Sequence, residues 1–213
     1  MIGIYTFIGS PFGRAVQAAC IEKGAPYRLV PIGPGEHKQP AHLARHPFGK
    51  APTINHDGFG LYETSAILRD LDQVYPDPAL TPADPKARAR MNQAIAINDC
   101  YFFQPNSGVG VVFNRVVAPK FGMPADEAAV AAALPAARHC VEVLAGFLEG
   151  RPYFAGDALS LADLPLGPQL DMLADCPEGA EMLKGTPIVG WLERLRERPS
   201  FRDTTWERLL QAA

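Results

Sequence analysis

Two short segments of the chain carry polar residues where a helix is expected to begin. Ser10 directly precedes Pro11, and serine followed by proline is a common start of a helix. Glu63 and Thr64 precede an apolar periodic segment that includes Ile67, so an acid and a hydroxyl lie at a second helix start. The first N–H groups of a helix have no partner within it and favour an anion. The pattern is consistent either with a site for a charged ligand or with plain helix capping.

A third segment opens a strand with a residue that cannot donate a hydrogen bond. Pro52 comes directly before the apolar residues of a predicted strand and follows Lys50 and Ala51. Sequence alone favours a trans bond before Pro52, because cis is the minor form of X-Pro bonds in folded proteins. Upstream, His37 and Lys38 lie in a loop rich in Gly and Pro, where a lysine is usually only solvated.

The elements that must position these residues alternate between strand and helix. Apolar runs, helical spacing and an Asp-Gly turn signal predict the order β-α-β-α-β-β-α over residues 1 to about 75. The predicted strands are 2–7, 27–32, 53–55 and 59–62, and the predicted helices begin at about 12, 38 and 64. This order indicates a small α/β domain.

The second half of the chain shows only helical patterns. Residues 76–85 are rich in proline and predict a linker, and 86–213 predict an all-helical domain. A long helical stretch from 86 to about 117 should bend at Pro105–Gly108, and another runs from about 124 to 150. A last helix is expected around Trp191, ending before Pro199.

Composition narrows the class of protein. The chain has 213 residues, a formal net charge of −3 and no basic block, so no nucleic-acid partner is expected. No uninterrupted apolar run approaches the roughly 20 residues that span a bilayer, and the N-terminus lacks the pattern of a signal peptide. The four cysteines are far apart and form no zinc-binding pattern, so we expect reduced thiols, no metal and a cytoplasmic location.

Four sequence pieces, in this order, resemble the soluble glutathione transferases over nearly the whole chain. The segment EHKQPAHLARHPFGKAPTINHDGFGLYETSAI is most similar to the phi class, in which E-H-K, N-P-F-G-x-x-P and E-S-x-A-I occur at this spacing. Thr64 stands where the family usually has serine. The segment AGDALSLADL resembles the shared C-terminal motif, in which Ser160 and Asp163 have a structural role. The resemblance implies a thioredoxin-like N-terminal domain followed by a helical bundle.

The resemblance also implies that glutathione, as co-substrate, lies extended along the first domain. The matching proline is cis in the family, so Pro52 is expected to be cis and Ala51 to pair with the cysteinyl unit like an added strand. Glu63 would bind the γ-glutamyl ammonium, and the Thr64 hydroxyl and amide would bind its carboxylate.

The same comparison assigns the other end of the tripeptide and the reacting sulfur. His37 and Lys38 match the pair that holds the glycine carboxylate, and Lys50 is expected to contact the same end. Ser10 matches the active serine of the phi and theta classes, whose hydroxyl donates to the sulfur and favours the thiolate. Tyr5 and Thr6 remain alternatives within the predicted strand.

Aromatic residues are the candidates for the binding site of the second substrate and for a contact between subunits. A hydrophobic electrophile is expected between the domains, with Phe12, Tyr101, Phe102 and Phe113 as candidate walls, although such aromatics can equally belong to the core. Phe48 lies between Pro and Gly in a loop and could dock into a partner subunit or pack within its own domain. The resemblance implies that the protein is a homodimer.

The sequence therefore predicts a cytoplasmic, homodimeric glutathione transferase with a role in detoxification. It would conjugate glutathione to hydrophobic electrophiles, with peroxide reduction as a further activity of the same thiolate. Two alternatives remain open. One is a non-enzymatic carrier or assembly module of the same fold, and the other is a glutathione-dependent isomerase or dehalogenase.

Overall fold

The computed structural model describes residues 1–212, which form two compact units. The first unit contains residues 1–81 together with the C-terminal segment from Arg196, and the second contains residues 82–195.

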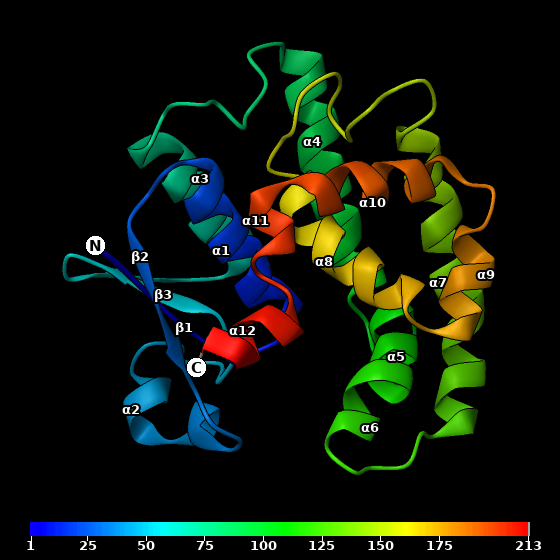
Figure 1. The fold of residues 1–213 in the computed structure, drawn as a ribbon, viewed down its shortest axis with the longest axis horizontal. Coiled ribbons are helices and arrows are strands. Elements are labelled where there is room, and N and C mark those ends of the chain that lie inside the picture. Colours follow the sequence, from blue (N-terminus) through cyan, green and yellow to red (C-terminus); the bar gives the residue numbers. More distant parts are fainter. Residues whose placement is uncertain (213) are drawn as a thin grey trace. The chain divides into compact units, whose positions relative to one another are not determined.

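A four-stranded mixed sheet forms the centre of the first unit (Figure 1). The strand order is β2-β1-β3-β4; β2 is parallel to β1, and β3 is antiparallel to both β1 and β4. The elements are β1 (Ile2–Thr6), α1 (Pro11–Glu22), β2 (Tyr27–Pro31), η1 (Glu36–Lys38), α2 (Pro40–Leu43), β3 (Thr53–His56), β4 (Phe59–Tyr62) and α3 (Thr64–Val74). The predicted β-α-β-α-β-β-α order and thioredoxin-like fold are confirmed.

The register of the sheet brings distant parts of the chain to one end. Tyr5 of β1 pairs with Val30 of β2 and with Thr53 of β3, and Thr53 pairs with Tyr62 of β4. The chain therefore leaves β1, β2 and β4 at the end of the sheet where it enters β3. The segments that follow Tyr5, Val30 and Tyr62, and the one that precedes Thr53, begin side by side.

Apolar residues at strand and helix spacing build the core of this unit. Ile2 and Ile4 of β1, Val16 of α1 and Leu71 of α3 are fully buried, and α1 packs against α3. Helix α1 begins as predicted, because Pro11 occupies its first turn and the Ser10 side chain accepts a hydrogen bond from the Gly13 amide.

The C-terminal segment belongs to the first unit rather than to the predicted helical domain 86–213. Arg14 of α1 donates to the Phe201 carbonyl (2.9 Å) and to Thr204 Oγ1 (3.3 Å). Arg198 forms a two-pronged ion pair with Glu22 (2.7 and 2.8 Å). These bonds join residues 176 to 190 positions apart, and sequence periodicity carries no signal for them.

The second unit is helical, as predicted. Its elements are α4 (Pro85–Ile97), η2 (Asn98–Phe102), α5 (Gly108–Val112), η3 (Phe113–Val117), α6 (Ala118–Lys120), α7 (Glu127–Phe147), α8 (Asp163–Ala174), α9 (Pro177–Leu183) and α10 (Pro187–Glu197, whose last residues fall in the first unit). Two more helices, α11 (Pro199–Arg202) and α12 (Trp206–Ala212), lie in the C-terminal segment. The expected bend falls between η2 and α5. The η2 and η3 segments are π-helical turns.

Asp163 organises the interior of the helical unit. Its carboxylate is fully buried and accepts bonds from the Phe154 and Ser160 amides, the Ser160 hydroxyl and the Trp191 indole (2.7–3.1 Å). Burial raises the pKa of Asp163, and the four donors act against that rise. The geometry agrees with the structural role that the resemblance implied.

Helix α7 is, within residues 1–212, the one helix long and apolar enough by composition to cross a membrane. Core helices of soluble proteins pass the same test. Arg138 and Glu142 interrupt its apolar stretch, and it packs against α5 and α9. Its length and composition are therefore weak evidence for a membrane span.

The ion pair between Glu22 and Arg198 yields a prediction about pH and stability. Burial alone raises the pKa of Glu22, but hydrogen bonds from Arg198 and Ser200 and the Arg198 charge outweigh it, so the net pKa lies below the ordinary value. A carboxyl with a lowered folded pKa stabilises the fold above its unfolded pKa of about 4.3 and loses that effect as the pH falls through the folded value.

We expect Glu22→Gln to lower the free energy of unfolding by about 1–2 kcal/mol at pH 7 and by much less near pH 3. Denaturant unfolding at both pH values measures the difference. Glu197→Gln, at an exposed position of α10, is the matched control and should change little at either pH. A loss for Glu22→Gln that is equally large at both pH values would contradict the assignment.

Candidate active site

The predicted glutathione residues of the first unit gather at one end of its sheet. Ser10 follows β1, Ala51 and Pro52 precede β3, and Glu63 follows β4. The register described above makes these three chain segments neighbours. The loop after β2 carries His37 and continues the row on the other side of β1.

Ser10 has a free hydroxyl proton in a half-buried position. Its Oγ accepts a hydrogen bond from the Gly13 amide (3.3 Å), while its backbone N–H donates to the Phe7 carbonyl (3.1 Å). Within residues 1–212 no hydrogen bond uses the Ser10 O–H as a donor. An oxygen that accepts from a helix amide is a better donor to a neighbouring anion, because successive hydrogen bonds polarise one another.

The two alternatives to Ser10 differ in the accessibility of their hydroxyls. Thr6 is fully buried, and its Oγ1 has no partner among the described residues. Tyr5 lies within β1, and the Arg45 guanidinium covers its ring at 4.4 Å. A hydroxyl with no exposed surface cannot reach a bound sulfur, so Thr6 is the weaker of the two.

Trp206 of α12 packs directly on the loop that carries Ser10. A Cβ atom built on Gly9, which has φ +83°, would lie 1.7 Å from a ring carbon of Trp206. Only glycine allows the indole to approach the backbone this closely. No sequence pattern predicts this contact, since Trp206 lies 197 positions beyond Gly9 in the chain.

The backbone of Ala51 is available at the start of β3. The Ala51–Pro52 peptide bond is cis, as predicted, and a second cis bond occurs at Asp77–Pro78. Strand β3 begins at Thr53, and within residues 1–212 neither the N–H nor the C=O of Ala51 forms a hydrogen bond. A peptide ligand could therefore use both groups.

Glu63 occupies a backbone conformation that non-glycine residues rarely adopt. Its φ is +69° and its ψ is 113°, held by β4 before it and by the bonds from the Ala66 and Ile67 amides to its carbonyl. Such a residue costs about 1–3 kcal/mol, and strained residues of this kind cluster at ligand sites. The Glu63 side chain is exposed and makes no capping bond, so the simple capping interpretation fails for it.

Thr64 is the first residue of α3 and is 9% exposed. Its hydroxyl forms no hydrogen bond with the described part of the chain. The acid and the start of the helix thus lie together, as the sequence predicted.

Three basic residues lie close to each other in the loops between β2 and β3. Lys38 and Lys50 are exposed, and neither forms an ion pair within residues 1–212. A Cβ on Gly49 would lie 3.0 Å from the His37 carbonyl oxygen, so the backbones on either side of the loop touch. The His37 ring is half-buried, stands edge-on to Phe7 (5.3 Å) and has a buried Nδ1 without a partner among the described residues.

Two buried histidines that the sequence analysis did not single out lie beneath this loop. His42 Nε2 is 2.7 Å from the Lys50 carbonyl, and its ring stacks with that of His46 (6.5 Å). The His46 ring lies 4.8 Å from that of Tyr62. Burial lowers the pKa of His46; the charge of Glu63 acts in the opposite direction. A buried histidine has no sequence pattern that separates it from an exposed one.

The candidate walls of the electrophile site behave differently from one another. Phe102 has no exposed surface and its ring packs on Gly108, so it is a core residue of the helical unit rather than a pocket wall. Tyr101 and Phe113 in the same unit are 65% and 47% exposed, and Phe12 in the first unit is half-buried. The adjacent rings of Tyr101 and Phe102 thus face opposite environments.

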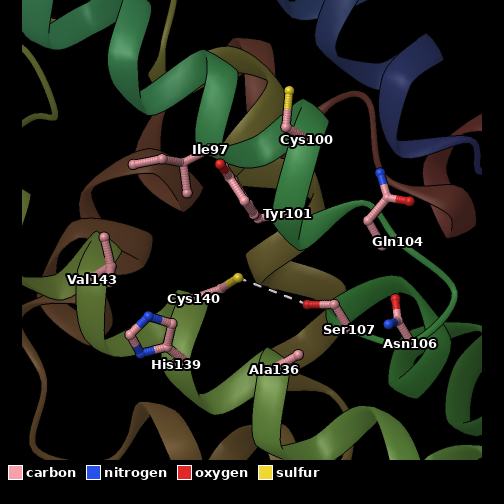
Figure 2. A pocket seen from close by; sticks show the side chains of 10 residues that line it. All are labelled: Ile97, Cys100, Tyr101, Gln104, Asn106, Ser107, Ala136, His139, Cys140 and Val143. Carbon is pink, nitrogen blue, oxygen red and sulfur yellow. Dashed lines mark hydrogen bonds between the residues drawn. The ribbon is translucent and has the colours of Figure 1, made fainter.

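A pocket of about 460 Å³ lies within the helical unit, between the end of α4 with η2 and one side of α7 (Figure 2). Its walls include Ile97, Tyr101 and Val143, and Ser107 Oγ lies 3.8 Å from Cys140 Sγ. No group of three or more His, Cys, Asp or Glu that could hold a metal occurs within residues 1–212.

The four cysteines are unpaired, as expected for reduced thiols. Cys20, Cys140 and Cys176 are buried and Cys100 is exposed. Burial raises the pKa of Cys20 to about 12 and that of Cys176 to about 11.

Comparison with known proteins agrees with this geometry. Residues 4–79 match the family model of the glutathione S-transferase N-terminal domain, and residues 108–199 match that of the C-terminal domain. The chain belongs to the glutathione S-transferase family, is most similar to its phi class, and is a glutathione transferase that takes glutathione as its co-substrate.

Individual relatives cover most of the chain. Glutathione S-transferase 4 of Zea mays is 30% identical over 93% of this chain and 89% of its own. Glutathione S-transferase F9 of Arabidopsis thaliana is 29% identical over 86% and 87%. The structure of maize glutathione S-transferase I with an atrazine glutathione conjugate has a TM-score of 0.84 at 26% identity, covering 100% of this chain and 99% of that one.

Proposed function

We propose that the end of the sheet defined by Ser10, Ala51 and Glu63 binds glutathione in an extended form and ionises its thiol. The observation that carries the proposal is the set of unused polar groups there: a hydroxyl proton, both backbone groups of Ala51 and a strained acid. A folded chain rarely leaves so many polar groups without partners unless a ligand or water takes them.

Each end of the tripeptide has matching charges. Glu63 takes the γ-glutamyl ammonium, and the Thr64 hydroxyl with the first amides of α3 takes the γ-glutamyl carboxylate. His37, Lys38 and Lys50 hold the glycine carboxylate, and the backbone of Ala51 pairs with the cysteinyl unit.

Ser10 then acts on the sulfur as a donor and not as a nucleophile. A thiol with a pKa near 8.5 is mostly protonated at pH 7, and only the thiolate attacks. A hydrogen bond from the Ser10 hydroxyl, with the start of α1 nearby, favours the thiolate. The thiolate adds to the electrophilic carbon of a hydrophobic substrate or displaces a halide from it, and the same chemistry serves detoxification.

Ser10→Ala should slow conjugation of glutathione to chlorodinitrobenzene roughly 10–100-fold near pH 6.5, because a pKa that rises by one to two units removes most of the thiolate. Glutathione affinity measured by calorimetry should change little. Ser10→Thr keeps a hydroxyl and should retain most of the rate. The rising limb of the pH–rate profile should move to higher pH in Ser10→Ala alone, and an unmoved limb would remove Ser10 from this role.

Replacement of Glu63 separates binding from stability. Glu63→Gly relieves the strain of φ +69°, so its thermal unfolding temperature should be no lower than that of the wild type. Its glutathione dissociation constant should nevertheless rise roughly 10–100-fold, which corresponds to about 1.4–2.8 kcal/mol. Glu63→Gln should weaken binding in the same way, and unchanged affinity in both variants would defeat the assignment.

We further propose that the protein is a homodimer in which Phe48 of each copy enters the helical-unit pocket of the other. The Phe48 side chain is 71% exposed and rests edge-on against His46 and Tyr62 (6.3 and 6.5 Å), which fixes its direction. The pocket of about 460 Å³ exceeds the roughly 150 Å³ that holds a benzene ring, and its lining is largely apolar. Two such contacts related by a twofold axis would form an isologous interface.

Phe48→Ala should weaken the dimer at least about 30-fold, the scale of a hot-spot aromatic, as measured by sedimentation. Ala136→Phe fills the pocket from the other side and should have the same effect. Phe121→Ala, at an exposed aromatic of the helical unit outside the pocket, is the control. A wild-type monomer would refute the dimer itself, and a Phe48→Ala dimer of normal affinity would refute this contact.

A cytoplasmic location completes the proposal. Glutathione is kept reduced there, and the four unpaired cysteines are consistent with a compartment in which disulfides are rare.

A further inference from the structure

We propose that His42 is a positioning residue that orients the Ala51 amide toward glutathione; this rests on the proposed glutathione site. His42 Nε2 lies 2.7 Å from the Lys50 carbonyl oxygen. A carbonyl only accepts, so Nε2 carries the hydrogen and donates it. His42 is 3% exposed, so the donor side of this bond is buried, while Lys50 itself is exposed.

The effect reaches Ala51 through the rigidity of one peptide group. The Lys50 C=O and the Ala51 N–H belong to the same planar unit, and that bond is trans. In a trans peptide the two groups point in opposite directions. When His42 holds the oxygen toward the protein interior, the Ala51 N–H points away from it, and within residues 1–212 that N–H has no other partner.

Packing around the imidazole keeps its donor in place. The His42 and His46 rings stack nearly parallel (15°) and the His46 ring in turn packs on Tyr62. The His42 backbone is held by α2 and its flanks, with its N–H on the Gln39 carbonyl (3.0 Å) and its C=O on the His46 amide (2.9 Å). The imidazole therefore has one direction in which to donate.

The burial of His42 is otherwise unfavourable. Its Nδ1 is buried without a hydrogen-bond partner among the described residues. An apolar side chain of similar size would avoid the loss of solvation at that nitrogen. The bond from Nε2 to Lys50 is the interaction that accounts for a histidine here.

A matched pair of substitutions isolates the donor from the packing. Gln and Met have nearly the same length and flexibility, and only Gln has an N–H at its end. We expect His42→Met to raise the glutathione dissociation constant and the KM for glutathione about tenfold, the scale of one lost orienting hydrogen bond. His42→Gln should remain within about threefold of the wild type.

The kinetic parameters distinguish a specific effect on glutathione binding from a general loss of packing in the site. In His42→Met, kcat with saturating glutathione and chlorodinitrobenzene should stay within about twofold, because the Ser10 hydroxyl is untouched. His46→Met removes the imidazole that packs on His42 but leaves the Nε2 donor and the Lys50 carbonyl in the chain, so it should raise KM for glutathione by no more than about threefold. Equal effects on KM in His42→Met and His46→Met would show a packing role and overturn the proposal.

A spectroscopic measurement tests the hydrogen bond without turnover. The sequence contains two Lys-Ala pairs, Lys50–Ala51 and Lys86–Ala87. Protein labelled with ¹³C at lysine carbonyls and ¹⁵N at alanine therefore shows two Lys-Ala cross peaks, and Lys86–Ala87 in α4 serves as the internal reference. Glutathione should shift the Ala51 signal and leave Ala87 in place.

Comparison of the variants gives the decisive outcomes. The Lys50 carbonyl resonance should move in ligand-free His42→Met and be restored in His42→Gln. An unmoved Lys50 carbonyl, or a wild-type affinity in His42→Met, would overturn the inference while the proposed site stands. Wild-type protein that fails to bind glutathione would instead refute the proposed site, and the Lys50 resonance would still report on the hydrogen bond.

Discussion

The pairing of Thr53 with both Tyr5 and Tyr62 is the constraint on which the candidate site depends. Because β3 runs against β1 and β4, its first residue pairs with the last residue of β4 and with the residue before the last of β1. Every segment with a proposed role in glutathione binding leaves or enters the sheet next to this row. A shift of the β3 register by one residue would exchange the faces of its side chains and separate these segments.

The helical unit depends on a different kind of constraint. Asp163 draws the amides of Phe154 and Ser160 and the indole of Trp191 to one carboxylate in a fully buried position. Leaving any of those donors without a partner would be costly in the interior. The first unit is thus ordered mainly by a sheet register and the second by one polar centre.

Much of the fold could be predicted from sequence because its signals are local. The Asp57-Gly58 turn, the Ser10-Pro11 helix start and the proline-rich linker each act through neighbouring residues. The attachment of the C-terminal segment could not be predicted, because Arg14 and Glu22 find partners far along the chain. The buried pair His42 and His46 was missed for a different reason, because no sequence pattern separates a buried histidine from an exposed one.

Helical spacing also failed to separate Tyr101 from Phe102. Both lie in a π-helical turn, whose wider hydrogen-bond step changes which side chains face the core. The sequence analysis assumed an ordinary helix and grouped the two rings as candidate pocket walls. Conversely, the sequence drew attention to Pro52 and Glu63 through local features, a proline before a strand and an acid at a helix start. Their predicted roles came from the family resemblance.

The burial of Cys20, Cys140 and Cys176 has a consequence for an enzyme that works among electrophiles. A carbon that reacts with a glutathione thiolate would also alkylate any ionised cysteine of the protein. Burial raises the pKa of all three thiols, so they remain protonated at neutral pH. Self-inactivation by the enzyme's own substrates is thereby confined to the exposed Cys100.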